Sequence, residues 1–80
     1  MSWYIVDIQC PKCSELHLLT NGLLLENGPT KAGNLAELYG ARPLPLALVG
    51  LLTDLAYCET LGEWVQQWDR ARVFLRPLQG

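Results

Sequence analysis

An apolar segment near the start of the chain, Ser2–Gln9, constrains the fold more than any other feature. It is rich in aromatic and β-branched residues, which favour β-strands, and its apolar side chains fall on both faces of such a strand. A strand that is apolar on both faces needs cover on both sides, so Ser2–Gln9 is expected at the centre of a sheet. The strand ends at Cys10-Pro11-Lys12-Cys13, where the proline stiffens the turn that follows.

The region after the two cysteines predicts a β-hairpin. Glu15–Thr20 and Leu23–Glu26 flank Asn21-Gly22, a dipeptide that favours a type I′ turn between two strands. A short helix over Ser14–Thr20, ended by Asn21-Gly22 as its C-cap, is the alternative. A further turn is expected at Asn27-Gly28-Pro29. With the N-terminal strand, the hairpin would form a short β-sheet.

Two stretches in the middle of the chain predict helices. In Thr30–Tyr39, Asn34 and Glu37 have the spacing of a capping box, and Gly40 follows at the position of a C-terminal glycine. The next stretch, Leu46–Tyr57, is apolar almost all round, which indicates a buried helix, although its first four residues could form a short inner strand.

A third helix is expected near the C-terminus. Thr60 and Glu63 have capping-box spacing, and apolar residues then recur at helical intervals. In this helix Trp64 is expected in the core and Trp68 nearer the surface. Alternatively, Val73–Leu75 is a closing strand that pairs with the first strand. The apolar residues of the expected C-terminal helix are Leu61, Trp64, Val65, Trp68, Ala71 and Leu75.

The predicted fold class is thus a single α+β domain over residues 1–80, with a short sheet packed against two or three helices.

Charge and hydropathy exclude several classes of protein. A net charge of −2 argues against a duplex nucleic-acid partner, and an apolar fraction of one half argues against disorder. The longest apolar stretch, Leu44–Tyr57, contains Pro45 and Asp54 and is shorter than the ~20 residues of a membrane span. No basic leader precedes the first apolar run, so we expect no signal peptide, no membrane contact and a cytoplasmic location.

Cys10 and Cys13 form the one local motif with a chemical mechanism. A C-x-x-C turn brings two sulfurs close enough to share a metal ion or form a disulfide. The strand followed by C-P-x-C resembles the knuckle of zinc ribbons, which implies a zinc cofactor. A closed zinc site has four ligands, and the chain has no second C-x-x-C, so His17 and Cys58 are the remaining candidates.

A second resemblance points to redox chemistry. The stretch Leu35–Leu46 resembles the thioredoxin-family segment that leads from the second helix to the cis-proline. The resemblance implies that Cys10 is the nucleophilic thiol, Cys13 the resolving thiol and Pro45 the cis-proline, in an element order β-α-β-α-β-β-α. A third interpretation is that the cysteines are inert and packed as small apolar residues without a cofactor.

The residues predict binding rather than catalysis. No Ser-His-Asp set, phosphate loop or nucleotide fingerprint can be assembled, so an enzyme is not expected. Residues 43–69 carry four acidic and no basic side chains, and three arginines then follow, a pattern that suits a protein partner. The size and mild acidity resemble small phage-encoded inhibitors such as anti-CRISPR proteins. The first hypothesis is thus a non-enzymatic module that docks on a larger protein, and the alternatives are a thioredoxin-like dithiol protein and a zinc-stapled domain. The expected partner-binding residues are Trp68, Arg70, Arg72 and Arg76.

Overall fold

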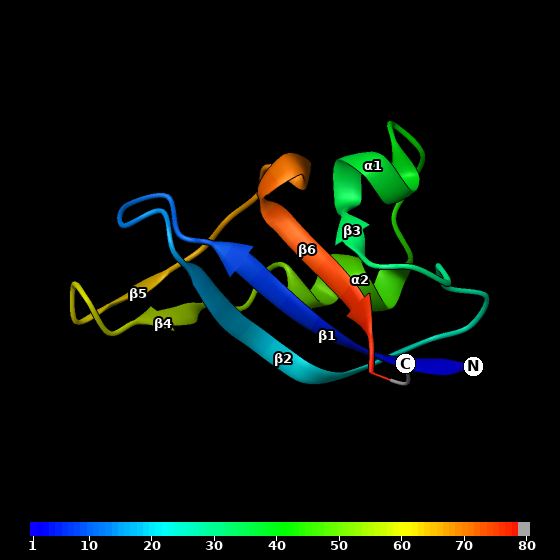
Figure 1. Cartoon of the computed structure of the whole chain (residues 1–80), viewed down its shortest axis with the longest axis horizontal. Coiled ribbons are helices and arrows are strands. Elements are labelled where there is room, and N and C mark those ends of the chain that lie inside the picture. Colours follow the sequence, from blue (N-terminus) through cyan, green and yellow to red (C-terminus); the bar gives the residue numbers. More distant parts are fainter. Residues whose placement is uncertain (79–80) are drawn as a thin grey trace.

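Strand β1 (Ser2–Gln9) lies at the centre of the main sheet in the computed structural model, which describes residues 1–78 (Figure 1). The sheet has the order β2-β1-β6-β3, and all its pairings are antiparallel. Its other strands are β2 (Leu16–Leu25), β3 (Gly33–Asn34) and β6 (Val73–Pro77). The predicted bounds and the central position of the first strand are confirmed.

Strand β2 is one continuous strand, so the hairpin predicted at Asn21-Gly22 is wrong, as is the alternative helix. The turn that reverses the chain is the Cys10–Cys13 segment, which joins β1 to β2. A type I′ turn needs positive φ at both central residues, and neither Asn21 nor Gly22 has it. Instead, the pairing advances from Val6↔Thr20 to Tyr4↔Leu23, which leaves an extra residue in β2 as a bulge.

The two α-helices are shorter than predicted. The helix α1 (Leu35–Tyr39) begins with the predicted capping box, in which the Glu37 amide donates to Asn34 Oδ1 at 2.8 Å. Gly40 ends it with φ of 59°, in the region that favours glycine. Residues before Leu35 are extended because Gly33 and Asn34 pair with β6.

The helix α2 (Leu46–Leu51) covers only the first half of the predicted apolar helix. It was expected to be buried all round, yet Leu46 is 88% exposed and only Leu48 of this helix is buried. No helix of the described residues is long and apolar enough to cross a membrane.

The predicted C-terminal helix is wrong. Its first part is a strand, β5 (Glu63–Val65), which pairs with β4 (Ala56–Cys58) in a separate two-stranded sheet. A 3₁₀ turn, η1 (Arg70–Arg72), then leads into β6. Tertiary contacts override the local pattern, because Thr60 bonds to Glu15 instead of capping a helix. The alternative of a closing strand on β1 is confirmed by β6.

One core joins both sheets to the helices, so the fold is a small α+β domain made mostly of sheet. Trp64, expected in this core, is 62% exposed on β5, and Trp68 is 57% exposed. The buried core residues are Tyr4, Val6, Ile8, Cys10, Leu23, Leu25, Leu35, Leu48, Leu52, Ala56, Cys58, Val65, Val73 and Leu75. In Figure 1, β4 and β5 lie below the β1–β2 turn at the left end of the view, away from α1.

Candidate metal centre

The β1–β2 turn is shaped around the sulfur of Cys10. The Cys10 amide donates to the Glu15 carbonyl at 2.7 Å, and the Ser14 amide donates to the Cys10 carbonyl at 3.0 Å. Ser14 adopts a positive φ of 66°, which lets the chain reverse within a few residues. The amides of Lys12 and Cys13 donate to Cys10 Sγ at 3.4 and 3.5 Å. Two amide donors directed at one sulfur stabilise its thiolate form.

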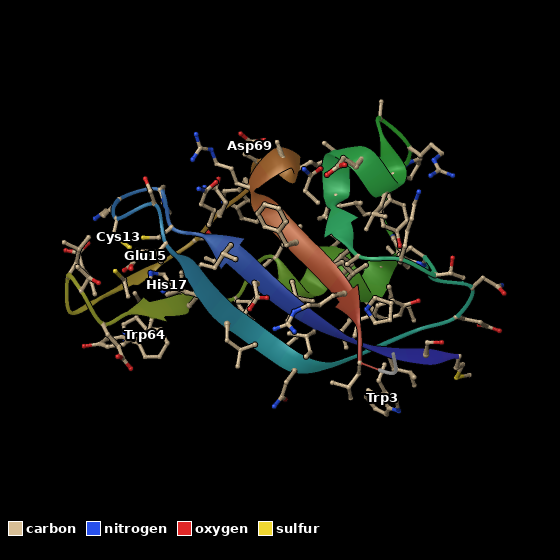
Figure 2. The ribbon with its side chains drawn as sticks, viewed as in Figure 1. Trp3, Cys13, Glu15, His17, Trp64 and Asp69 are labelled. Carbon is tan, nitrogen blue, oxygen red and sulfur yellow. The ribbon has the colours of Figure 1, made fainter. Side chains whose placement is uncertain are left out.

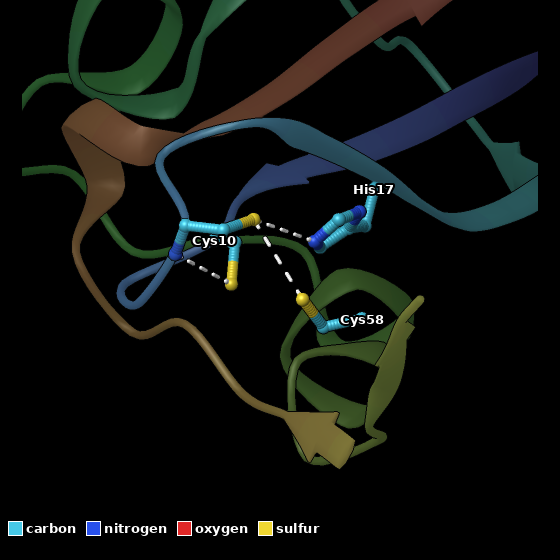
Figure 3. A group of neighbouring side chains, drawn as sticks. Cys10, His17 and Cys58 are labelled. Atoms are coloured by element: carbon cyan, nitrogen blue, oxygen red, sulfur yellow. Dashed lines mark hydrogen bonds between the residues drawn. The ribbon is translucent and has the colours of Figure 1, made fainter. Parts of the chain in front are cut away.

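Two more donor atoms reach this turn from other segments. His17, near the start of β2, places Nε2 at 3.3 Å from Cys13 Sγ. Cys58, the last residue of β4, places its Sγ at 3.6 Å from the same sulfur. The four ligand atoms of Cys10, Cys13, His17 and Cys58 all lie within 4.8 Å of one another (Figure 3). The fold thus brings together all four residues that the sequence offered as metal ligands.

The spacing of these atoms suits a tetrahedral ion. Zinc bonds of about 2.3 Å to sulfur and 2.0–2.1 Å to nitrogen place neighbouring ligand atoms roughly 3.4–3.8 Å apart. The Cys13–His17 and Cys13–Cys58 separations of 3.3 and 3.6 Å are close to that range, and the widest pair needs only a modest contraction.

No protein-family model, curated protein or solved structure matches this chain. What the cluster can bind is therefore inferred from its donor atoms. Three sulfurs and one imidazole are the ligands that zinc accepts in closed sites, whereas Mg²⁺ and Ca²⁺ prefer oxygen. The residues present fit a metal ion such as zinc.

The burial of the four residues and the pKa values of their thiols bear on how the cluster would bind a cation. Cys10 and Cys58 are fully buried, Cys13 and His17 are partly buried, and all three cysteines are free thiols. Burial opposes ionisation of Cys10, but the amides of Cys13 and Lys12 outweigh it and lower its pKa to about 6. The Glu15 amide favours a Cys13 thiolate, yet desolvation and the neighbouring sulfurs raise the pKa of Cys13.

Contacts outside the cluster connect the β1–β2 turn to β4 and β5. The Lys12 ammonium donates to Glu63 Oε1, and this carboxylate raises the pKa of Lys12. Gln67 Nε2 donates to the Gln9 carbonyl at 3.1 Å. Sequence reasoning missed these supporting residues, because their partners lie more than forty positions away and no local pattern marks them. The 3.2 Å bond from Thr60 Oγ1 to Glu15 Oε2 belongs to the same set.

The other predicted site residues contribute no ligand atom to the cluster. Pro45 is the N-cap of α2 and has a trans peptide bond. A strand rather than a helix follows Cys13, so the element order implied by the thioredoxin resemblance is not observed. The predicted partner-binding side chains make internal contacts: Trp68 to Gln66, Arg70 to the carbonyls of Gly40 and Arg42, Arg72 to Asp69, and Arg76 to Asp7.

Proposed function

We propose that this chain is a zinc-stapled binding module. One Zn²⁺ bound by Cys10, Cys13, His17 and Cys58 would tie the β1–β2 turn to β4, and the stapled surface would dock on a protein. The observation that carries the proposal is the gathering of four suitable ligand atoms, from three separate segments, within 4.8 Å. Their positions 10, 13, 17 and 58 are too scattered for the cluster to follow from a local motif alone.

The metal would be structural rather than catalytic. A catalytic zinc keeps one coordination position open for water or substrate, whereas four protein ligands close the shell. Two of the four residues, Cys10 and Cys58, are fully buried, which also keeps solvent from the ion.

A bound metal ion would stabilise the part of the fold that the polar contacts hold most weakly. A two-stranded sheet is only marginally stable by itself, and β4 and β5 form a sheet separate from the main one. The contacts from Lys12 and Thr60 to this unit are exposed, and exposed polar contacts contribute little stability. A bound ion at Cys58 would fix β4 to the main sheet far more firmly.

Docking is supported by apolar side chains that remain on the surface near the cluster. Tyr57 and Trp64 stack edge to face across β4 and β5, with ring centroids 5.1 Å apart, and both are exposed. Leu16 and Leu18 of β2 are also exposed. Aromatic residues, tryptophan above all, are enriched at the centres of protein interfaces.

A dithiol redox function is the second candidate, because the pKa of Cys10 is lowered to about 6. A low thiol pKa is typical of redox-active cysteines, but such a thiol also has to be reached by its substrate. Cys10 is fully buried, so the lowered pKa is better used in binding a metal ion.

The test is native mass spectrometry of purified protein, combined with tetrahedral Co²⁺ absorption after metal exchange. We expect one zinc per chain, lost in Cys58→Ser. Ala56→Ser is the matched control, because it places the same hydroxyl at a buried position of the same strand without removing a ligand. Wild-type protein that takes up no stoichiometric zinc or cobalt would overturn the proposal, as would full zinc binding by Cys58→Ser and His17→Gln alike.

A further inference from the structure

We infer that the groove beside β2 binds an extended peptide, which adds to the free edge of β2 as a further strand and carries basic residues between apolar ones. This inference rests on the proposed function, because His17 lies in one wall, Cys58 lies between Tyr57 and Glu59 of the other, and a shared ion would fix the separation of the two walls. The groove has a volume of about 700 Å³. Residues 15–18 form one wall, and Tyr57, Glu59 and Thr60 form the other.

The edge of β2 is open to a further strand. The main sheet ends at β2, so within residues 1–78 no strand pairs with its outer side. Sheet edges are usually protected by charged residues, proline or short length. β2 is ten residues long and contains no proline, aspartate, glutamate, lysine or arginine. Its outward backbone groups therefore offer the hydrogen bonds that strand addition uses.

The side chains around this edge suit apolar residues of the peptide. Leu16 and Leu18 alternate with His17, so they project from one face of β2 while His17 faces the cysteine cluster. Tyr57, on the opposite wall, is backed by Trp64. Figure 2 shows Glu15, His17 and Trp64 at this same end of the molecule. Alternate side chains of an added strand would pack on these leucines and rings.

The negative charge of the groove favours a basic peptide. Glu15 and Glu59 lie on its two walls, and both are exposed. Among the described residues Glu59 makes no ion pair, and Lys12 on the adjacent turn is engaged by Glu63. Glu15 accepts a hydrogen bond from Thr60 but, like Glu59, has no cationic partner in the part of the chain that the structure describes. Carboxylates without a cationic partner beside an apolar edge favour lysine or arginine on the partner.

A second copy of this chain is a poorer fit to the same edge. If two β2 strands paired antiparallel in full register, Leu16 of one copy would face Leu25 of the other. Glu15 would then face Glu26, and like charges directly opposite each other destabilise a strand pair. The peptide is therefore the occupant that the charges favour.

The probe is a dye-labelled, end-blocked peptide of alternating valine and lysine, with seven residues, titrated into zinc-loaded protein and followed by fluorescence anisotropy. We expect saturable binding that weakens with salt. The same peptide with glutamate in place of lysine should bind at least tenfold more weakly. Methylation of alternate peptide nitrogens on the pairing side should have a similar effect, because it removes the strand hydrogen bonds.

Matched variants locate the site. Leu18→Lys should reduce affinity at least tenfold, whereas Leu46→Lys, the same change at an exposed position of α2, should not. Glu59→Lys should also weaken binding, and Asp54→Lys serves as its control. Equal binding of the two peptides, unaffected binding by Leu18→Lys, or a dimer in sedimentation that occupies the β2 edge would each overturn the inference.

Zinc content measured on the same samples separates this inference from the proposed function. Protein that holds one zinc but binds no lysine peptide overturns the peptide site alone. Protein that binds the peptide but takes up no zinc overturns the zinc-binding proposal and the dependence of the groove on the ion.

Discussion

Removal of the metal should loosen the β4–β5 unit before it unfolds the main sheet. Of the polar contacts described above, those of Lys12 with Glu63 and of Thr60 with Glu15 lie on the surface. Exposed contacts of this kind contribute little to stability, because water screens them. Ala56 of β4 and Val65 of β5 pack in the core shared with the main sheet, and an ion bound by Cys10 and Cys58 would add the strongest polar attachment to that packing.

The expected size of the effect follows from linkage between binding and folding. With free zinc at about a thousand times its dissociation constant, binding to the native state adds about 4 kcal/mol to the free energy of unfolding. For a domain of this length, each kcal/mol shifts the melting temperature by roughly 4–8 °C. Chelation should therefore lower the melting temperature by about 15–30 °C. The lost binding free energy is a large part of the ~5–15 kcal/mol free energy of unfolding that is typical of a folded domain.

Circular dichroism melts with and without chelator measure this shift, and hydrogen exchange locates it. The amides of β4 and β5 should lose protection in chelator, while those paired between β1 and β6 keep most of theirs. Cys58→Ser should reproduce both effects without chelator, and Ala56→Ser should still respond to it. An unchanged melt in excess chelator, or exchange that rises equally in every strand, would refute the reasoning.

Three further outcomes follow from the same structure. Zinc occupancy, measured by native mass spectrometry at a fixed zinc concentration, should fall as the pH is lowered, because protons compete with the metal for the thiolates. The native Cys10 thiol has a pKa lowered to about 6 and binds fewer protons than the unfolded one, so the stabilisation from its thiolate is lost as the pH falls toward 6. Trp64→Ala should cost under about 1 kcal/mol in urea unfolding because the ring is exposed, whereas Leu75→Ala in the core should cost about 2–5 kcal/mol. Gly28→Ala should lower the melting temperature, because its Cβ would lie 2.3 Å from the Tyr4 hydroxyl; Gly22→Ala, with nothing within 4 Å, is the control.

Local signals predicted the parts of the fold that depend on local interactions. The central strand and the Asn34–Glu37 capping box follow from residue types and spacing over a few positions, and both are present. The knuckle-like turn was also readable, because C-P-x-C directly after a strand leaves few ways to reverse the chain.

The failures came where distant contacts decide the local structure. Residues 60–75 have helical spacing, yet Thr60 bonds to Glu15 and Glu63 to Lys12, and Val73 and Leu75 fill the core beside β1. Nothing within the segment reveals these partners, so propensity favoured the wrong element. The ligand set could be named by elimination, but only the pairing of β4 with β5 shows how Cys58 reaches the turn.

If His17 both lines the groove and binds the metal, the peptide and the metal must influence each other's binding by equal factors. Coupling between two binding equilibria is reciprocal, so the factor by which zinc tightens peptide binding equals the factor by which peptide tightens zinc binding. A competing chelator titrated against zinc-loaded protein, with and without the valine–lysine peptide, measures the second factor, and anisotropy on loaded and chelated protein measures the first. We expect both to exceed about fivefold, which is the lower end of typical coupling. Zinc affinity unchanged by saturating peptide would mean that the walls of the groove are held by the surface contacts of Glu15 and Thr60 instead of the ion.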